Sequence, residues 1–263
     1  MAELIISEKP SQAKLIAEAL ADTKPKKVTE DKVSYYELTK DGKHIYVGCA
    51  VGHLFNLKEK NKKGWTYPVF ETEWAPSYEI NKGSDFTKKY IHILSKLAEK
   101  CDKFVIACDY DLEGSLIGYN VLRCIAKKKD GRRMKFSTLT KEELFESYEH
   151  ASEHLDFPLI HSGEARHLID WVFGINLSRA LTLSIKNATK SFKILSSGRV
   201  QGPTLKLLSE RELEIQKFKP KPFWELEAIG DVNAQHGKGK FWDEKEVKKI
   251  HEMGPLDFNG SSE

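Results

Sequence analysis

Cysteine pairs and long apolar runs are missing from this 263-residue sequence. Its four cysteines form no Cys-X-X-Cys pair and have no histidine at zinc-finger spacing, which favours reduced thiols in a protein core. No uninterrupted apolar run approaches the ~18 residues of a membrane-spanning helix. The N-terminus shows no basic-then-apolar signal pattern. We therefore expect a protein of the cytoplasm that has no membrane partner.

A strong excess of one charge is also lacking. The net charge is only +3, from 42 basic and 39 acidic residues, so bulk charge argues weakly for a polyanionic partner. Basic residues nevertheless cluster in segments typical of loops, and clusters on a shared face would form a salt-sensitive nucleic-acid surface. These segments are residues 24–27, 58–63, 127–133 and 217–221. Taken singly, each of them fits an ordinary solvated loop better than a phosphate contact.

An apolar segment that ends in three carboxylates is the most informative stretch. Residues 104–108 predict a buried strand, and the apolar spacing that follows predicts a helix. Asp109, Asp111 and Glu113 are therefore expected at the C-terminal edge of a sheet, where α/β proteins bind ligands. Alternating carboxylates suit the hard cation Mg²⁺, and the spacing fits no EF-hand. An acidic turn without a metal is the alternative.

A second predicted edge carries one acid and one base. Residues 4–7 predict a buried strand and Ser11 opens a helical pattern, with Glu8 and Lys9 between them. A helix-capping acid, favoured by the helix dipole, is the alternative for this turn. Further along, His53 follows a hairpin predicted around Asp41-Gly42. That histidine is consistent with a phosphate contact or with a satisfied core histidine.

The periodicity changes after residue ~136. Strands and helices alternate up to that point, and residues 133–136 predict the last of these strands. This alternation predicts an α/β fold with a mostly parallel sheet flanked by helices. Residues 141–151, 164–187 and 203–215 then show helical spacing and indicate a mainly helical module. Residues 223–229 predict a strand that begins a further structural unit. The polar tail after Gly230 is expected to have no core of its own.

A second cluster of polar residues lies in the helical module. Arg166 belongs to the long helical segment, and Arg199 and Gln201 belong to a Ser-Ser-Gly loop that precedes Pro203. The amides and guanidinium of such a loop can hold a phosphate. A plain loop-to-helix junction with proline in the first turn is the alternative.

Five motifs, in the same order, resemble the type IA DNA topoisomerases, and the archaeal and topoisomerase III-like branch is nearest. The resemblance covers residues ~3 to ~229, and ordered motifs are more specific than a lone Asp-X-Asp. One departure is Gly202, where the family often has threonine. The motifs are residues 5–11 (IISEKPS), 52–54 (GHL), 109–114 (DYDLEG), 165–176 and 197–205 (SGRVQGPTL).

This resemblance implies domains and site residues. It implies a Rossmann-like Toprim domain over 1–138, a helical DNA-binding gate module over 139–220, and the start of a further domain or a disordered tail over 221–263. It implies Glu8 as the acid/base and Lys9 as a contact of the scissile phosphate. The implied Mg²⁺ ligands are Asp109, Asp111 and Glu113. The implied contacts to single-stranded or negatively supercoiled DNA are His53, Arg166, Arg199 and Gln201.

The nucleophile of the family is a tyrosine in a Tyr-Pro-Arg-Thr context, which these residues lack. Tyr67-Pro68 is the only Tyr-Pro, and we interpret it as structural. We therefore expect Mg²⁺-dependent, ATP-independent strand cleavage, passage and religation only with a tyrosine-bearing C-terminal segment, in the cytoplasm and near the nucleoid in a prokaryote. The alternatives are a non-catalytic nucleic-acid-binding fragment and another Toprim enzyme, a nuclease or primase. Residues 164–205 speak against the latter.

Overall fold

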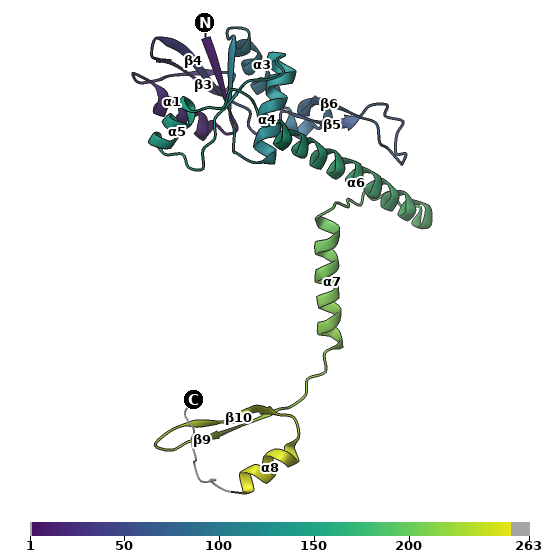
Figure 1. The fold of residues 1–263 in the computed structure, drawn as a ribbon. Coiled ribbons are helices and arrows are strands. Elements are labelled where there is room, and N and C mark those ends of the chain that lie inside the picture. Colours follow the sequence, from purple (N-terminus) through teal and green to yellow (C-terminus); the bar gives the residue numbers. More distant parts are fainter. Residues whose placement is uncertain (1, 254–263) are drawn as a thin grey trace. The chain divides into compact units, whose positions relative to one another are not determined.

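The computed structural model describes residues 2–253, and a six-stranded sheet is the central element of its N-terminal part (Figure 1). Four neighbouring strands run parallel, while β2 and β3 form an antiparallel edge. In spatial order the strands are β2 (Lys26–Glu30), β3 (Val33–Lys40), β4 (Lys43–Cys49), β1 (Ala2–Ser7), β7 (Lys103–Ala107) and β8 (Arg132–Arg133). The predicted α/β fold with a mostly parallel sheet is confirmed.

Helices cover both faces of this sheet. One face packs on α1 (Pro10–Leu20) and α5 (Lys141–Glu149), and the other on α3 (Thr87–Ala98), α4 (Leu112–Val121) and η2 (Leu122–Ala126). Successive strand residues point to opposite faces, so both faces of β1 are buried. Leu4 and Ile6 lie in one core and Ile5 in the other. The short helices α2 (Ser77–Ile80) and η1 (Lys82–Ser84) precede α3.

Two strand predictions have different outcomes. The hairpin around Asp41-Gly42 is confirmed: both turn residues have positive φ (49° and 74°), as a two-residue hairpin turn requires. The strand predicted over 133–136 is wrong in extent, since β8 ends at Arg133. The backbone N–H and C=O of Arg133 pair instead with Ser152, at 2.9 and 3.0 Å.

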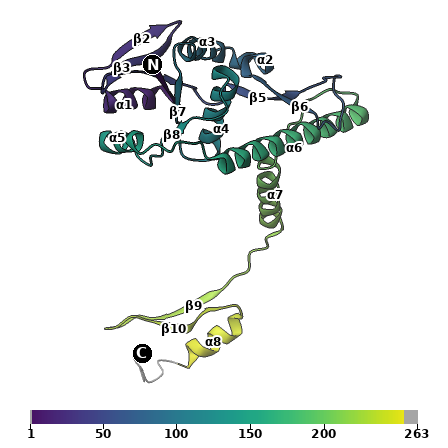
Figure 2. The ribbon, with the colours of Figure 1, turned by 45° about the horizontal axis from the view of Figure 1, so that its top comes forward.

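The long helix α6 (Phe157–Thr189) begins seven residues before the predicted start at 164. The Asp156 side chain accepts a hydrogen bond from the Leu159 N–H at 3.2 Å, and Pro158 lies in the first turn. A capping aspartate followed by proline marks the start of a helix, and the apolar periodicity alone does not contain this signal. The hairpin of β5 (Phe55–Glu59) and β6 (Thr72–Pro76) lies beside α6 (Figure 2).

A buried ion pair attaches α6 to this hairpin. Arg179 is only 6% exposed, and its guanidinium donates to the Glu59 carboxylate at 2.6 Å and to the Thr66 carbonyl at 2.7 Å. One turn earlier, the Asn176 amide pairs with the backbone N–H and C=O of Val69. The polar motif around Asn176 therefore holds the loop between β5 and β6 in place.

By length and composition alone, α6 is apolar enough to cross a membrane, although only 11% of its most apolar 18-residue window is buried in the structure. The expectation that no segment reaches this length is therefore corrected. That expectation was based on uninterrupted apolar runs. An average of hydropathy over 18 residues tolerates isolated polar residues within the window. Core helices of soluble proteins pass the same test, but they are mostly buried, which α6 is not. The helix also carries Arg166, Asp170 and Arg179, which pair with other acids and bases.

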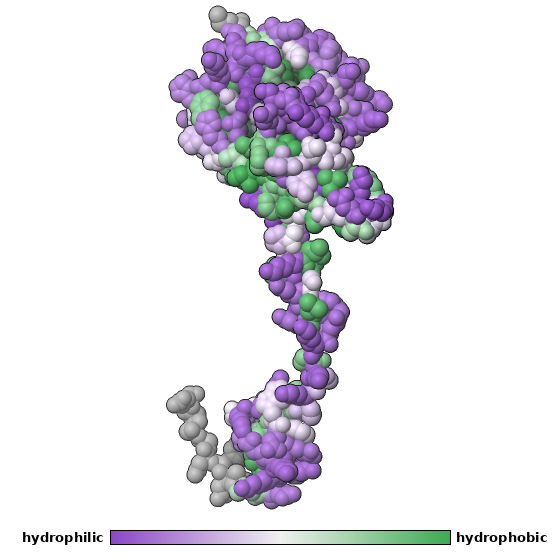
Figure 3. All heavy atoms as spheres, turned by 90° about the vertical axis from the view of Figure 1, so that its right-hand side faces the viewer, coloured by the Kyte–Doolittle hydropathy of each residue, from purple (hydrophilic) through white to green (hydrophobic). Residues whose placement is uncertain are grey.

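The chain divides into two units, Met1–Gly202 and Pro203–Glu263. Most of α7 (Gln201–Lys217) belongs to the second unit, together with β9 (Trp224–Ala228), β10 (Ala234–Phe241) and α8 (Glu244–Glu252). Apolar side chains on α7 face solvent, and green atoms appear among purple ones along it in Figure 3. The three-domain division of the sequence stays a prediction.

The tail predicted to lack a core needs correction up to residue 253. Strands β9 and β10 form an antiparallel pair, and α8 packs against it. Phe241 is fully buried and Val247 is 7% exposed. Two well-spaced apolar residues are thus enough to form a small core that the polar composition of the segment concealed. Residues 254–263 lie outside the described residues.

Candidate metal and nucleic-acid site

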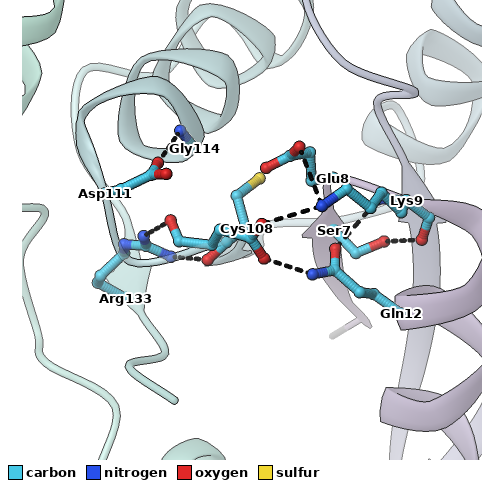
Figure 4. A network of polar contacts seen from close by, with 9 residues as sticks. Ser7, Glu8, Lys9, Gln12, Cys108, Asp111, Gly114 and Arg133 are labelled. Carbon is cyan, nitrogen blue, oxygen red and sulfur yellow. Dashed lines mark hydrogen bonds and ion pairs between the residues drawn. The ribbon is translucent and has the colours of Figure 1, made fainter. Parts of the chain in front are cut away.

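The two motifs with charged residues leave the sheet at the same edge. Strand β1 pairs in parallel with β7, and Ser7 lies opposite Ala107, so the turns that follow both strands emerge side by side (Figure 4). The Lys9 Nζ atom lies 3.0 Å from Asp109 Oδ2 and 3.6 Å from Glu8 Oε1. A base from the first turn therefore lies between acids from both turns, which are a hundred residues apart in sequence.

Gln12 completes this contact, and the sequence reasoning missed it. Its side-chain amide donates to Asp109 Oδ1, while its Oε1 accepts the backbone N–H of Lys9 at 3.1 Å. Gln12 is the third residue of α1, a position from which a glutamine side chain can reach back to the backbone N–H of the residue before the helix. A glutamine at this position is a sequence signal for the bond to the Lys9 backbone N–H. No signal in the sequence indicated the bond to Asp109. Both carboxylate oxygens of Asp109 are held, which orients the side chain.

Electrostatics at this edge favour a proton on Glu8. Burial, together with the negative charges of Asp109 and Asp111, raises the pKa of Glu8 above its ordinary value, and the nearby Lys9 only partly offsets this. The pKa of Lys9 is raised by its hydrogen bond to Asp109 and by the charge of Glu8, so the ammonium stays charged. A carboxylic acid with a raised pKa beside a fixed positive charge can exchange a proton with a bound reactant.

Asp111 and Gly114 shape the acidic turn. Asp111 Oδ1 accepts the Gly114 N–H at 2.7 Å and thereby caps α4. A Cβ atom at Gly114 would lie 2.3 Å from the backbone carbonyl oxygen of Asp109, so only glycine allows this close approach. The carboxylate of Asp111 and the absence of a side chain at Gly114 thus serve the same tight turn.

Arg133 supports the turn from within the protein, and the sequence reasoning had assigned it to a basic loop. It is 1% exposed, and its guanidinium donates to the carbonyls of Cys108 and Asp109, both at 2.8 Å (Figure 4). These bonds hold the backbone that carries Asp109. Arg133 begins the strand predicted over 133–136, and this was the one sign in the sequence that its side chain is buried.

The Glu113 carboxylate has its partners on the loop before β5 and on α6. Its Oε2 atom lies 2.9 Å from His53 Nε2, and its Oε1 atom lies 3.6 Å from Arg166 Nε. The structure therefore brings Glu8, Lys9 and Asp109 together and places Glu113 with His53 and α6.

Ion pairs continue from Glu113 along α6 to the loop before α7. Arg166 Nε also lies 3.9 Å from Asp170 Oδ2, and Asp170 accepts two bonds from Arg199, at 2.6 and 3.3 Å. Gln201 accepts a hydrogen bond from Ser196 at 3.4 Å. Both guanidinium groups are half exposed, so they are accessible to an anion that competes with the carboxylates.

Comparison with known proteins is consistent with this geometry. A Toprim domain model matches residues 3–139, and a model described as DNA topoisomerase matches residues 154–254. DNA topoisomerase 1 of Methanocaldococcus jannaschii is 51% identical over 255 residues, which cover 96% of this chain and 33% of that protein. DNA topoisomerase 1 of Pyrococcus furiosus is 47% identical over 254 residues, covering 94% and 24%.

One solved structure is similar over nearly the whole chain. Full-length topoisomerase I from Thermotoga maritima superimposes with a TM-score of 0.63 at 28% sequence identity, covering 94% of this chain and 37% of that one. The chain thus spans between 24% and 37% of the length of these three proteins.

Proposed function

This chain belongs to the type IA DNA topoisomerases, and from this premise we propose that it supplies the metal-binding and acid–base part of single-strand DNA cleavage, passage and religation. The contact between Lys9 and Asp109 at 3.0 Å carries the proposal, because it joins the two charged motifs at one sheet edge. The substrate we propose is single-stranded or negatively supercoiled DNA.

The Toprim domain implies a divalent cation, and we propose Mg²⁺ held by Asp109 and Asp111 with help from Glu113. The donor set fits, because carboxylate oxygens are the hard ligands that Mg²⁺ prefers. The charges of Asp109 and Asp111 also raise the pKa of Glu8, so this edge carries negative charge that a cation would offset. When bound, the ion supplies positive charge for the reacting phosphate.

The side chains of this edge then have distinct tasks. We propose that Glu8 gives a proton to the leaving sugar oxygen and takes it back on religation. The Lys9 ammonium neutralises charge that develops on the non-bridging oxygens. Backbone phosphates exchange with the carboxylate partners of the guanidinium groups along α6 and the following loop. The proposed DNA contacts are His53, Arg166, Arg199 and Gln201.

No nucleophile is assigned to residues 1–263. Tyr67 belongs to the loop between β5 and β6, and we propose that the attacking tyrosine comes from a tyrosine-bearing C-terminal segment of the same enzyme. We further propose a cytoplasmic location, near the nucleoid in a prokaryote, and no membrane partner. The helix α6 supports the last point, since it lies within the region that matches DNA topoisomerases.

A chimera tests the proposed function. We expect M. jannaschii DNA topoisomerase 1, with its matching 255 residues replaced by this chain, to relax negatively supercoiled plasmid in Mg²⁺. Residues 1–263 alone should leave the plasmid unchanged. Plasmid relaxation is measured by agarose gel electrophoresis. A folded chimera that binds DNA without relaxing it would contradict the proposal and favour the non-catalytic binding fragment.

Magnesium should also stabilise the chain without DNA. A ligand at about 100 times its dissociation constant contributes about 2.7 kcal/mol, so we expect millimolar Mg²⁺ to raise the melting temperature by several degrees. The double variant Asp109→Asn/Asp111→Asn should lose this increment, while Glu18→Gln on the exposed face of α1 should keep it. Differential scanning calorimetry measures the shift. If Mg²⁺ raises the melting temperature of the parent chain, the double variant and Glu18→Gln by the same amount, Asp109 and Asp111 are excluded as its ligands.

A further inference from the structure

Two histidines and a glutamate from three separate segments converge beside the acidic turn. They are His53 from the loop before β5, Glu113 from the first turn of α4 and His167 from α6. One ligand atom from each lies within 4.8 Å of the other two. We refer to these residues as the His53–Glu113–His167 cluster. All three belong to the first unit of the chain.

The spacing of these atoms is close to what a small metal ion needs. Ligands at about 2.1 Å from a tetrahedral ion lie about 3.4 Å from each other. His53 Nε2 and Glu113 Oε2 are already 2.9 Å apart. The rings of His53 and His167 lie 5.2 Å apart between centroids. Small rotations of the side chains would therefore bring all three ligand atoms onto one ion.

The types of ligand distinguish this cluster from the carboxylate edge. Imidazole nitrogens suit Zn²⁺ and neighbouring transition metals, whereas Mg²⁺ prefers oxygen. Two histidines and one carboxylate are a ligand set of zinc sites that leave a coordination position open. A borderline divalent ion therefore selects this cluster, while a hard ion selects Asp109 and Asp111.

The surroundings support the histidines as ligands. All three side chains are half buried, so an ion can reach them from solvent. His53 Nδ1 is buried and has no hydrogen-bond partner in the described part of the chain, so the contact of Nε2 with the Glu113 carboxylate at 2.9 Å is what orients this ring. The Trp74 ring lies 5.1 Å from the ring of His167 and covers it.

One nearby charge opposes the binding of a cation. Arg166 Nε lies 3.6 Å from Glu113 Oε1, the carboxylate oxygen that faces away from His53. The charge of Arg166 is shared with Asp170 at 3.9 Å. The repulsion is therefore reduced, and the Oε2 atom remains directed at the histidine.

We propose that the His53–Glu113–His167 cluster is a second metal site, selective for Zn²⁺ and similar transition-metal ions. An ion there would link the loop before β5, the start of α4 and the helix α6, and would compete with Mg²⁺ for Glu113. The site shares Glu113 and His53 with the proposed function, but binding of the ion requires neither DNA nor Mg²⁺.

Titration of the chain with Co²⁺, a coloured substitute for Zn²⁺, tests the proposal. We expect visible d–d bands of an ion with fewer than six ligands, and competition by Zn²⁺ but not by millimolar Mg²⁺. His53→Gln and His167→Gln should each weaken binding by about 100-fold or more, because even the outer partners of metal ligands are worth about 10–100-fold. Isothermal titration with Zn²⁺ measures the affinities.

The chain offers matched controls. His161→Gln removes an exposed histidine of the same helix that pairs with Glu164 at 3.1 Å, and Glu18→Gln removes an exposed carboxylate of α1 that belongs to neither proposed metal site. Both should bind Co²⁺ as the parent chain does. Circular dichroism without metal confirms that each variant is folded. The proposal is overturned if His161→Gln and His167→Gln weaken binding equally, if neither cluster variant weakens it, or if a thiolate-to-cobalt band shows cysteine ligation.

Discussion

Replacing Glu8 with glutamine in the chimera should slow plasmid relaxation by about 10²–10⁴-fold, the usual contribution of a positioned acid or base. Glutamine keeps the size and polarity of the side chain but cannot transfer a proton. Burial and the neighbouring aspartates raise the pKa of Glu8, which prepares it to hold a proton for the leaving oxygen. Initial rates at saturating Mg²⁺ and DNA measure the loss.

The matched control for this variant is Glu18→Gln. Glu18 is a half-exposed residue of α1 whose contact is an ion pair with Lys14 at 3.8 Å, so its loss should leave relaxation unchanged. DNA affinity, measured by fluorescence anisotropy with a labelled single strand, should be similar for both variants. A Glu8→Gln chimera that relaxes plasmid at the parental rate would remove Glu8 from the mechanism while leaving the metal proposal standing.

Replacing Arg179 with leucine should destabilise the first unit. Its loss leaves the Glu59 carboxylate, whose side chain is 9% exposed, without its cation, and the Thr66 carbonyl without its donor. The melting temperature should therefore fall by several degrees. Thermal unfolding followed by circular dichroism measures the change.

Two variants separate this effect from a general loss of surface charge. The double variant Arg179→Leu/Glu59→Leu should regain most of the stability, because it removes both members of the buried pair. Lys14→Ala, which breaks an exposed pair on α1, should have no measurable effect. If Arg179→Leu alone melts like the parent chain, α6 is not held to the hairpin through this residue.

The sequence correctly predicted the strands and turns that carry the charged motifs. Residues 104–108 and 4–7 form adjacent buried strands, and Asp109 and Glu8 follow them directly. Local signals suffice for this, because an uncharged β-favouring run followed by glycine or proline determines where a strand ends. The same signals failed where capping decided the boundary, as at Asp156, and where backbone pairing ended β8 early.

The sequence alone determined the mostly parallel sheet, the presence of the helical segments and the sheet edge at which we propose that ligands bind, since each follows from the periodicity of neighbouring residues. Only the tertiary structure decided which distant side chains meet: Gln12 with Asp109, Arg179 with Glu59, and His53 with Glu113. These partners are 97, 120 and 60 residues apart. Periodicity shows which face of an element is buried, but contacts across the core depend on strand order and helix packing, which no local pattern encodes.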